Sequence, residues 1–137
     1  MWRHLAPIVA AFLACAACNF SQDMSGSAAA VTQFHSRFNS ENYPAIYAGA
    51  AADLRASTPE KDFTDLLAAV RRKLGIERKT ASTGFFVNAT TGGTVIRLNY
   101  NTTFAEGQAA EEFVFRSQNG KYLLLSYNIN SPLLITR

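Results

Sequence analysis

Few side chains in this 137-residue chain suit acid–base chemistry, and two of them are candidate general bases. His35 follows Phe34 in a helical pattern, and Asp53 follows a run of alanines. Because His35 is one position off an apolar stripe, we interpret it as a partly exposed surface histidine. The only other histidine is His4, so we expect no metal site built on histidines and no cofactor.

Glu111 is a third carboxylate of interest. Alternation along a predicted strand puts it on the same face as Phe113 and Phe115. A carboxylate on an apolar face could act as a base, whereas one at a strand end usually lies solvated at the rim of the sheet. We interpret Glu111 as such a rim residue.

Four tyrosines are predicted to form a binding surface, because tyrosine combines a broad apolar ring with a hydroxyl group. We expect them to gather where the strand ends meet the first helix. The alternative is that these rings only close the mouth of the core. The four residues are Tyr43, Tyr47, Tyr100 and Tyr127.

Two cysteines end an apolar stretch near the N-terminus, and the sequence turns polar directly after them. Arg3 and His4 precede the uninterrupted apolar run from Leu5 to Ala17. A short basic start, an apolar run and small residues at its end are typical of an export signal. The run is shorter than the roughly 20 apolar residues that a membrane-spanning helix needs. The predicted organisation is a signal peptide at 1–17, a flexible tether at 18–27 and one domain at 28–137.

The stretch CAAC resembles the motif of bacterial lipoprotein signal peptides, in which small residues precede a cysteine that is acylated and becomes the new N-terminus. The resemblance implies that Cys18 carries the lipid, with Cys15 as the alternative acceptor, and that the lipid anchors the protein in a membrane. The resemblance also implies that the protein lies on the periplasmic face of the outer membrane, because Asn19 stands where an Asp usually retains such proteins in the inner membrane. Ordinary cleavage, which would give a soluble periplasmic or secreted protein, is the alternative. After processing at Cys18 no free thiol would remain for redox or metal chemistry.

The elements that must position these side chains are predicted as helices followed by strands. Val31, Phe34 and Phe38 have helical spacing. A short helix is predicted at 43–48 and a brief strand at 51–57. The clearest helix spans 59–74, capped by Ser57 or Thr58 and ended by Gly75. Its predicted apolar face consists of Phe63, Leu66, Leu67, Val70 and Leu74.

Four strands are predicted at 75–90, 92–104, 109–118 and 121–130, separated by hairpin turns. This order predicts an α+β domain in which N-terminal helices pack on a curved four-stranded antiparallel sheet. Its core is expected to bring together Leu67, Val70, Leu98, Phe113 and Leu125.

The stretch VTQFHSRFNSENYPAIY, the helix ending in RRKLG and the strands after it are similar to the nuclear transport factor 2-like, or cystatin-like, fold. The resemblance implies a cone-shaped roll, and enzymes of this fold commonly place a His or an Asp inside the cone. The same scaffold also serves binding modules, so the resemblance does not decide the function.

The charge balance argues against nucleic acid as a partner. The 13 basic residues exceed the 10 acidic ones by only three, and Arg3 lies in the predicted signal peptide. We therefore predict a lipid-anchored cell-envelope protein without enzymatic activity, which binds an envelope protein or an apolar small ligand. The alternative is a small enzyme of the isomerase or hydrolase type that uses Asp53 or His35 as its base.

Overall fold

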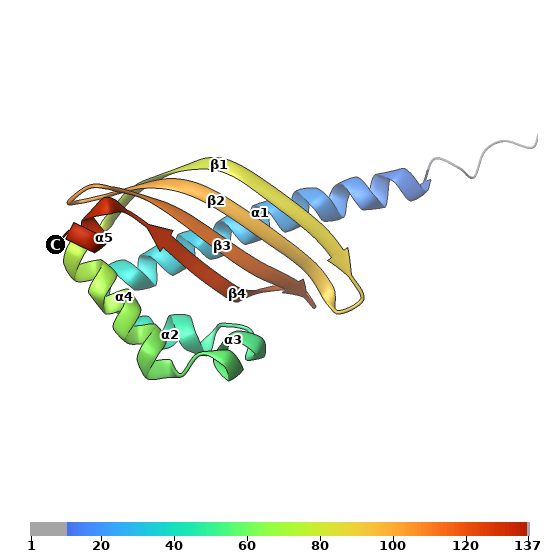
Figure 1. Cartoon of the computed structure of the whole chain (residues 1–137). Coiled ribbons are helices and arrows are strands. Elements are labelled where there is room, and N and C mark those ends of the chain that lie inside the picture. The colour runs from blue at the N-terminus through green and yellow to red at the C-terminus, as the bar shows by residue number, and fades with distance from the viewer. Residues whose placement is uncertain (1–10, 137) are drawn as a thin grey trace, which may run out of the picture.

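The computed structural model describes residues 11–136, with side chains described from residue 19 onward. It has the predicted α+β fold, with helices before an antiparallel sheet in the order β1-β2-β3-β4. Figure 1 shows the sheet curving over α1, with α2, α3 and α4 grouped on the side of β4. The elements are α1 (Ala11–Asn39), α2 (Tyr43–Ala48), α3 (Ala52–Ser57), α4 (Glu60–Leu74), β1 (Glu77–Thr90), β2 (Gly93–Phe104), β3 (Gln108–Gln118), β4 (Lys121–Asn130) and α5 (Pro132–Thr136).

The core lies between α1, α4 and the concave face of the sheet. It consists of apolar side chains that follow the helical and strand periods of the sequence. Its members include Val31, Phe34, Phe38, Phe63, Leu67, Val70, Leu74, Ile96, Leu98, Phe113, Phe115 and Leu124. Leu125 was predicted to belong here, and that prediction is wrong. The register skips Leu125 between the pairs Val114–Ser126 and Phe115–Leu124, so this bulge turns Leu124 and Tyr127 inward instead.

The helix α4 differs from its prediction in two details. Leu66 is 47% exposed, because the buried residues Phe63, Leu67 and Val70 form a stripe along α4 and Leu66 lies just outside it. Pro59 occupies the N-cap position and no side chain caps the helix, so neither Ser57 nor Thr58 has that role. Gly75 ends the helix as predicted, with a φ of 80° that favours glycine.

The segment predicted as a brief strand at 51–57 is the helix α3 instead. Leu54 is its one buried large apolar side chain, so the segment never had a stripe of alternating apolar residues. The amide of Arg55 donates to the carbonyl of Ala51 at 3.2 Å, and that of Thr58 donates to the carbonyl of Leu54 at 2.9 Å. These bonds close the turn as a helix.

The predicted flexible tether is also helical, because α1 runs without a break through residues 19–27. Asp23 accepts hydrogen bonds from the hydroxyls of Ser117 at 3.0 Å and Tyr122 at 3.2 Å. Ser27 is fully buried. At Gly26 a Cβ atom would lie 2.2 Å from the Tyr122 ring, so the close packing of helix on sheet requires glycine there. The described part of this segment is therefore packed against the domain.

The predicted signal peptide at 1–17 and the side chains of Cys15 and Cys18 lie outside the residues whose side chains are described. Within residues 11–136, no helix is both long enough and apolar enough to cross a membrane.

Candidate functional site

A histidine, a glutamate and a tyrosine form a hydrogen-bonded group in the interior of the domain. The Nε2 atom of His35 lies 2.9 Å from Oε1 of Glu111, and the Tyr127 hydroxyl donates to Oε2 of Glu111 at 2.5 Å. His35 is 4% exposed and Glu111 is 2% exposed. The interpretations of a surface histidine and of a solvated rim carboxylate are both wrong.

The sheet and the first helix explain why these polar groups are buried. Glu111 pairs with Tyr100 of β2 and with Ile129 of β4, so it lies in an inner strand of the sheet. α1 lies against the sheet (Figure 1), and the contact between His35 and Glu111 joins the two elements at this point. A buried polar group needs a partner, and each member of the group supplies one for another.

An ionised Glu111 would assign the tautomer of His35. A carboxylate only accepts hydrogen bonds, so in that state Glu111 accepts one from the Tyr127 hydroxyl and one from Nε2–H of His35. In the neutral imidazole the lone pair is then on Nδ1. Holding one tautomer in this way is what a carboxylate does for a histidine that binds or accepts a proton.

Aromatic rings pack against His35 and Tyr127 on the inner side of the group. The centroid of the His35 ring lies 5.7 Å from that of Phe34 and 5.6 Å from that of Phe113, in edge-to-face geometry. Tyr127 lies 4.7 Å from Phe34 and 5.1 Å from Phe113, measured between ring centroids. Burial raises the pKa of Tyr127 well above its ordinary value of 10.0, and the neighbouring Glu111 adds to the increase.

This raised pKa predicts a loss of stability at high pH. Unfolded Tyr127 ionises near pH 10, whereas the folded protein keeps it protonated. Its contribution is therefore fully present below about pH 10 and is lost as the pH rises through the folded-state pKa. We expect the free energy of unfolding, measured in urea at neutral pH and at about pH 11, to fall less steeply in Tyr127→Phe than in the wild type. Equal slopes in the two proteins would contradict the buried network.

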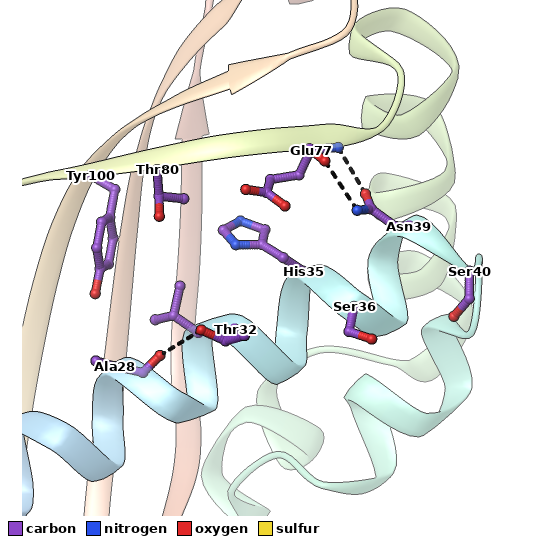
Figure 2. Close-up of a pocket in the computed structure, with 10 residues that line it drawn as sticks. Ala28, Thr32, His35, Ser36, Asn39, Ser40, Glu77, Thr80 and Tyr100 are labelled. Atoms are coloured by element: carbon purple, nitrogen blue, oxygen red, sulfur yellow. Dashed lines mark hydrogen bonds between the residues drawn. The ribbon is translucent and has the colours of Figure 1, made fainter.

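His35 also lines a groove of about 700 Å³ between α1 and the start of the sheet. Figure 2 shows its ring directed from α1 toward β1. Asn39 closes one end, since its amide donates to the carbonyl of Glu77 at 3.1 Å and its oxygen accepts from the Glu77 amide at 2.8 Å. Most of the lining residues are polar, although apolar atoms supply more of the lining surface. The residues are Ala28, Val31, Thr32, His35, Ser36, Asn39, Ser40, Glu77, Thr80 and Tyr100.

The four tyrosines predicted as one binding surface do not gather in the structure. Tyr100 and Tyr127 flank Phe113, with Tyr100 half-buried beside the groove. Burial raises the pKa of Tyr100 as well. On α2, Tyr43 packs against Phe38, and the hydroxyl of Tyr47 lies 3.0 Å and 2.8 Å from the carbonyl oxygens of Arg55 and Thr58. No local sequence pattern indicates this division, because it depends on where α2 packs.

Asp53 lies on α3, away from the groove. Its two carboxylate oxygens accept hydrogen bonds from the guanidinium of Arg116 at 2.9 and 3.1 Å. These bonds hold the pKa of Asp53 below its ordinary value, which makes the carboxylate a weak base. Both candidate bases have a partner that orients them, but only His35 also lines the groove.

Aromatic rings occupy the interior, where an apolar ligand was expected. A cavity of about 50 Å³ remains beside Phe34, Tyr122 and Leu124, which is too small for a drug-sized molecule. Among the described residues, no cluster of three or more His, Cys, Asp or Glu side chains could hold a metal ion. Comparison of the sequence with protein-family models and with curated proteins finds no match.

Proposed function

We propose that this protein is a lipid-anchored module of the cell envelope that binds a small polar ligand in the groove beside His35. The anchor is supported by the CAAC motif at the end of an apolar N-terminal stretch. The α+β fold supports the likeness to the nuclear transport factor 2-like scaffold at the level of fold class.

The observation that supports the ligand site is the hydrogen bonding of the two ring nitrogens of His35. Glu111 occupies Nε2, and no hydrogen bond to Nδ1 is found among the described residues. The Tyr100 hydroxyl also has no hydrogen-bond partner in that part of the chain, and both residues line the groove. An acceptor and a hydroxyl left free beside a cavity can bind a ligand that donates and accepts hydrogen bonds.

The charge and lining of the groove narrow the class of ligand. The polar side chains are mainly hydroxyls, from Thr32, Ser36, Ser40 and Thr80, and Glu77 adds a carboxylate. The hydroxyls of Thr32 and Ser40 donate to the backbone carbonyls of Ala28 and Arg37, so they can only accept hydrogen bonds from a ligand. The hydroxyls of Ser36 and Thr80 can exchange hydrogen bonds in both directions, while the carboxylate disfavours anions. We therefore propose uncharged or cationic ligands that carry hydroxyl or amino groups, in place of the apolar ligand that the sequence suggested.

The ring signals of His35 in nuclear magnetic resonance spectra provide the test. His35 is the only histidine downstream of His4, so its ring nitrogens give one set of signals in the processed protein. We expect members of a library of small sugars, amines and amino alcohols to shift the Nδ1 signal while Nε2 stays protonated. Tyr100→Phe should weaken this binding about tenfold, the effect of losing one hydrogen bond of about 1.4 kcal/mol.

Tyr47→Phe is the matched control, because it removes a tyrosine hydroxyl that hydrogen-bonds to α3 and its following turn and does not line the groove. Its ligand affinity should equal that of the wild type. Ligands that bind without moving the His35 signals, or equally well to Tyr100→Phe, would place the site elsewhere.

The same geometry favours a second candidate function, an enzyme of the isomerase or hydrolase type. Glu111 holds His35 in the tautomer whose Nδ1 can accept a proton, and carboxylate–imidazole pairs serve as general bases in many enzymes. His35→Gln should then abolish turnover of a substrate found by screening, while the midpoint of thermal unfolding shows whether the variant is folded. Turnover that persists in a folded His35→Gln variant would exclude this role.

A further inference from the structure

Aromatic side chains are exposed at the end of the domain nearest the proposed anchor. Phe20 on α1 is 45% exposed and Phe85 on β1 is 56% exposed, with their ring centroids 6.0 Å apart. We call these two residues the aromatic patch. Phe86, 57% exposed, lies on the other face of β1, with its ring centroid 6.0 Å from the guanidinium of Arg97. Figure 1 shows that the β1–β2 hairpin and the N-terminal part of α1 lie at the same end of the molecule.

The aromatic patch lies close to the position of Cys18 along α1. Residues 18 and 20 lie in one continuous helix, so they are about 3 Å apart along its axis. A few residues further on, Asp23 bonds to Ser117 and Tyr122 of the sheet. A lipid on residue 18 would therefore be joined to the folded domain by a helix that is packed against the sheet, and the aromatic patch would lie at the bilayer surface.

We infer that the aromatic patch inserts into the headgroup region of the lipid bilayer and fixes the orientation of the domain on the membrane. This inference rests on the proposed acylation of Cys18. Phenylalanine on the apolar face of a membrane-bound element gains free energy by burial at the boundary between headgroups and acyl chains. Two rings that are half exposed in water offer that area without any change of fold.

The orientation has a consequence for the groove. His35 lies 15 positions beyond Phe20 in α1, which corresponds to about 22 Å along the helix axis. With the aromatic patch at the bilayer, the groove is held away from the lipid phase. It is then open to ligands dissolved in the surrounding aqueous space.

Fluorescence quenching by brominated lipid tests the inference in the full-length, exported protein. Trp2 is the only tryptophan in the sequence and lies in the predicted signal peptide, so Phe85→Trp introduces a single probe into the processed chain. The protein is reconstituted in vesicles of phosphatidylethanolamine and phosphatidylglycerol, with or without bromine on the acyl chains. We expect Phe85→Trp to lose most of its fluorescence in the brominated vesicles.

Leu66→Trp is the matched control, because Leu66 is a similarly exposed apolar residue on α4, at 47% against 56% for Phe85. Its fluorescence should be the same in both kinds of vesicle. An acylated protein whose probe at residue 85 is not quenched would overturn membrane insertion and leave the anchor intact. Blue-shifted emission at residue 85 that bromine does not quench would also overturn it, and would indicate contact with a second protein chain.

Mass spectrometry of the mature N-terminus separates this inference from the anchor. If the chain is not acylated and the probe at residue 85 is still quenched when vesicles are added, the aromatic patch binds membranes and the proposed lipid anchor is wrong. If the chain is not acylated and neither probe is quenched, both proposals fail.

Discussion

Replacing Glu111 with alanine is expected to lower the free energy of unfolding by about 3–5 kcal/mol, the usual cost of removing one partner from a buried polar pair. The substitution leaves the Nε2–H group of His35 and the hydroxyl of Tyr127 buried without an acceptor. It also leaves a void among the rings of Phe34 and Phe113. Urea unfolding followed by circular dichroism measures the change.

Glu112 is the matched control, because it is the next residue of β3 and its side chain points to the opposite face of the sheet. Its carboxylate lies 3.7 Å from Arg97 in a pair that is largely exposed, so Glu112→Ala should cost less than about 1 kcal/mol. Equal losses for the two substitutions would mean that the buried hydrogen bonds contribute nothing specific.

Glu111→Gln separates the hydrogen bonds from the charge. The amide has the shape of the carboxylate but offers one acceptor oxygen, so it can accept from Tyr127 or from His35 and not from both in the native geometry. We expect the free energy of unfolding of Glu111→Gln to lie between those of the wild type and of Glu111→Ala. In the histidine spectrum the proton should no longer be fixed on Nε2, because the single amide oxygen is shared between two donors and the amide NH2 can itself donate to Nε2.

The fold could be predicted from the sequence because its main signals are local. Each signal reflects one element and the face that it buries. Helical spacing places Val31, Phe34 and Phe38 on one side of α1, and strand alternation places Ile96 and Leu98 on one face of β2. The errors occurred where tertiary structure overrides local pattern. The bulge in β4 that turns Leu125 out of the core depends on how β4 pairs with β3, and no residue within β4 predicts it.

The site could be predicted only in part, for a related reason. Alternation placed Glu111 on the apolar face with Phe113, which the structure confirms. Its burial depends on the helix that crosses that face, and its partner His35 lies 76 residues away in the sequence. His35 was assigned to the surface because it lies beside the apolar stripe of α1, but the curved sheet covers more of the helix than that stripe. Such a pairing is visible only once the two elements are packed.

The second large prediction tests the proposed lipid anchor at Cys18. Cys18→Ser should remove the acyl group from the protein completely, leaving it unprocessed or soluble, whereas Cys15→Ser should leave acylation and membrane fractionation unchanged. The reason is chemical, since a serine hydroxyl cannot form the thioether that holds the lipid, and Ala16 and Ala17 directly precede Cys18. Membrane fractionation and mass spectrometry of the mature N-terminus measure both outcomes.

The structure makes this experiment easy to interpret. Among the side chains that the structure describes, from residue 19 onward, the first in α1 that hydrogen-bonds to the sheet is Asp23, which lies beyond the substituted position. The midpoint of thermal unfolding of the soluble form should therefore match that of the wild type, and loss of anchoring cannot be mistaken for unfolding. An unmodified residue at the mature N-terminus of the wild type would refute the anchor. An acylated Cys15 would keep the anchor but move it three residues, about 4.5 Å along the helix, farther from the aromatic patch. The aromatic patch would then lie farther from the bilayer, and quenching at residue 85 would be weaker.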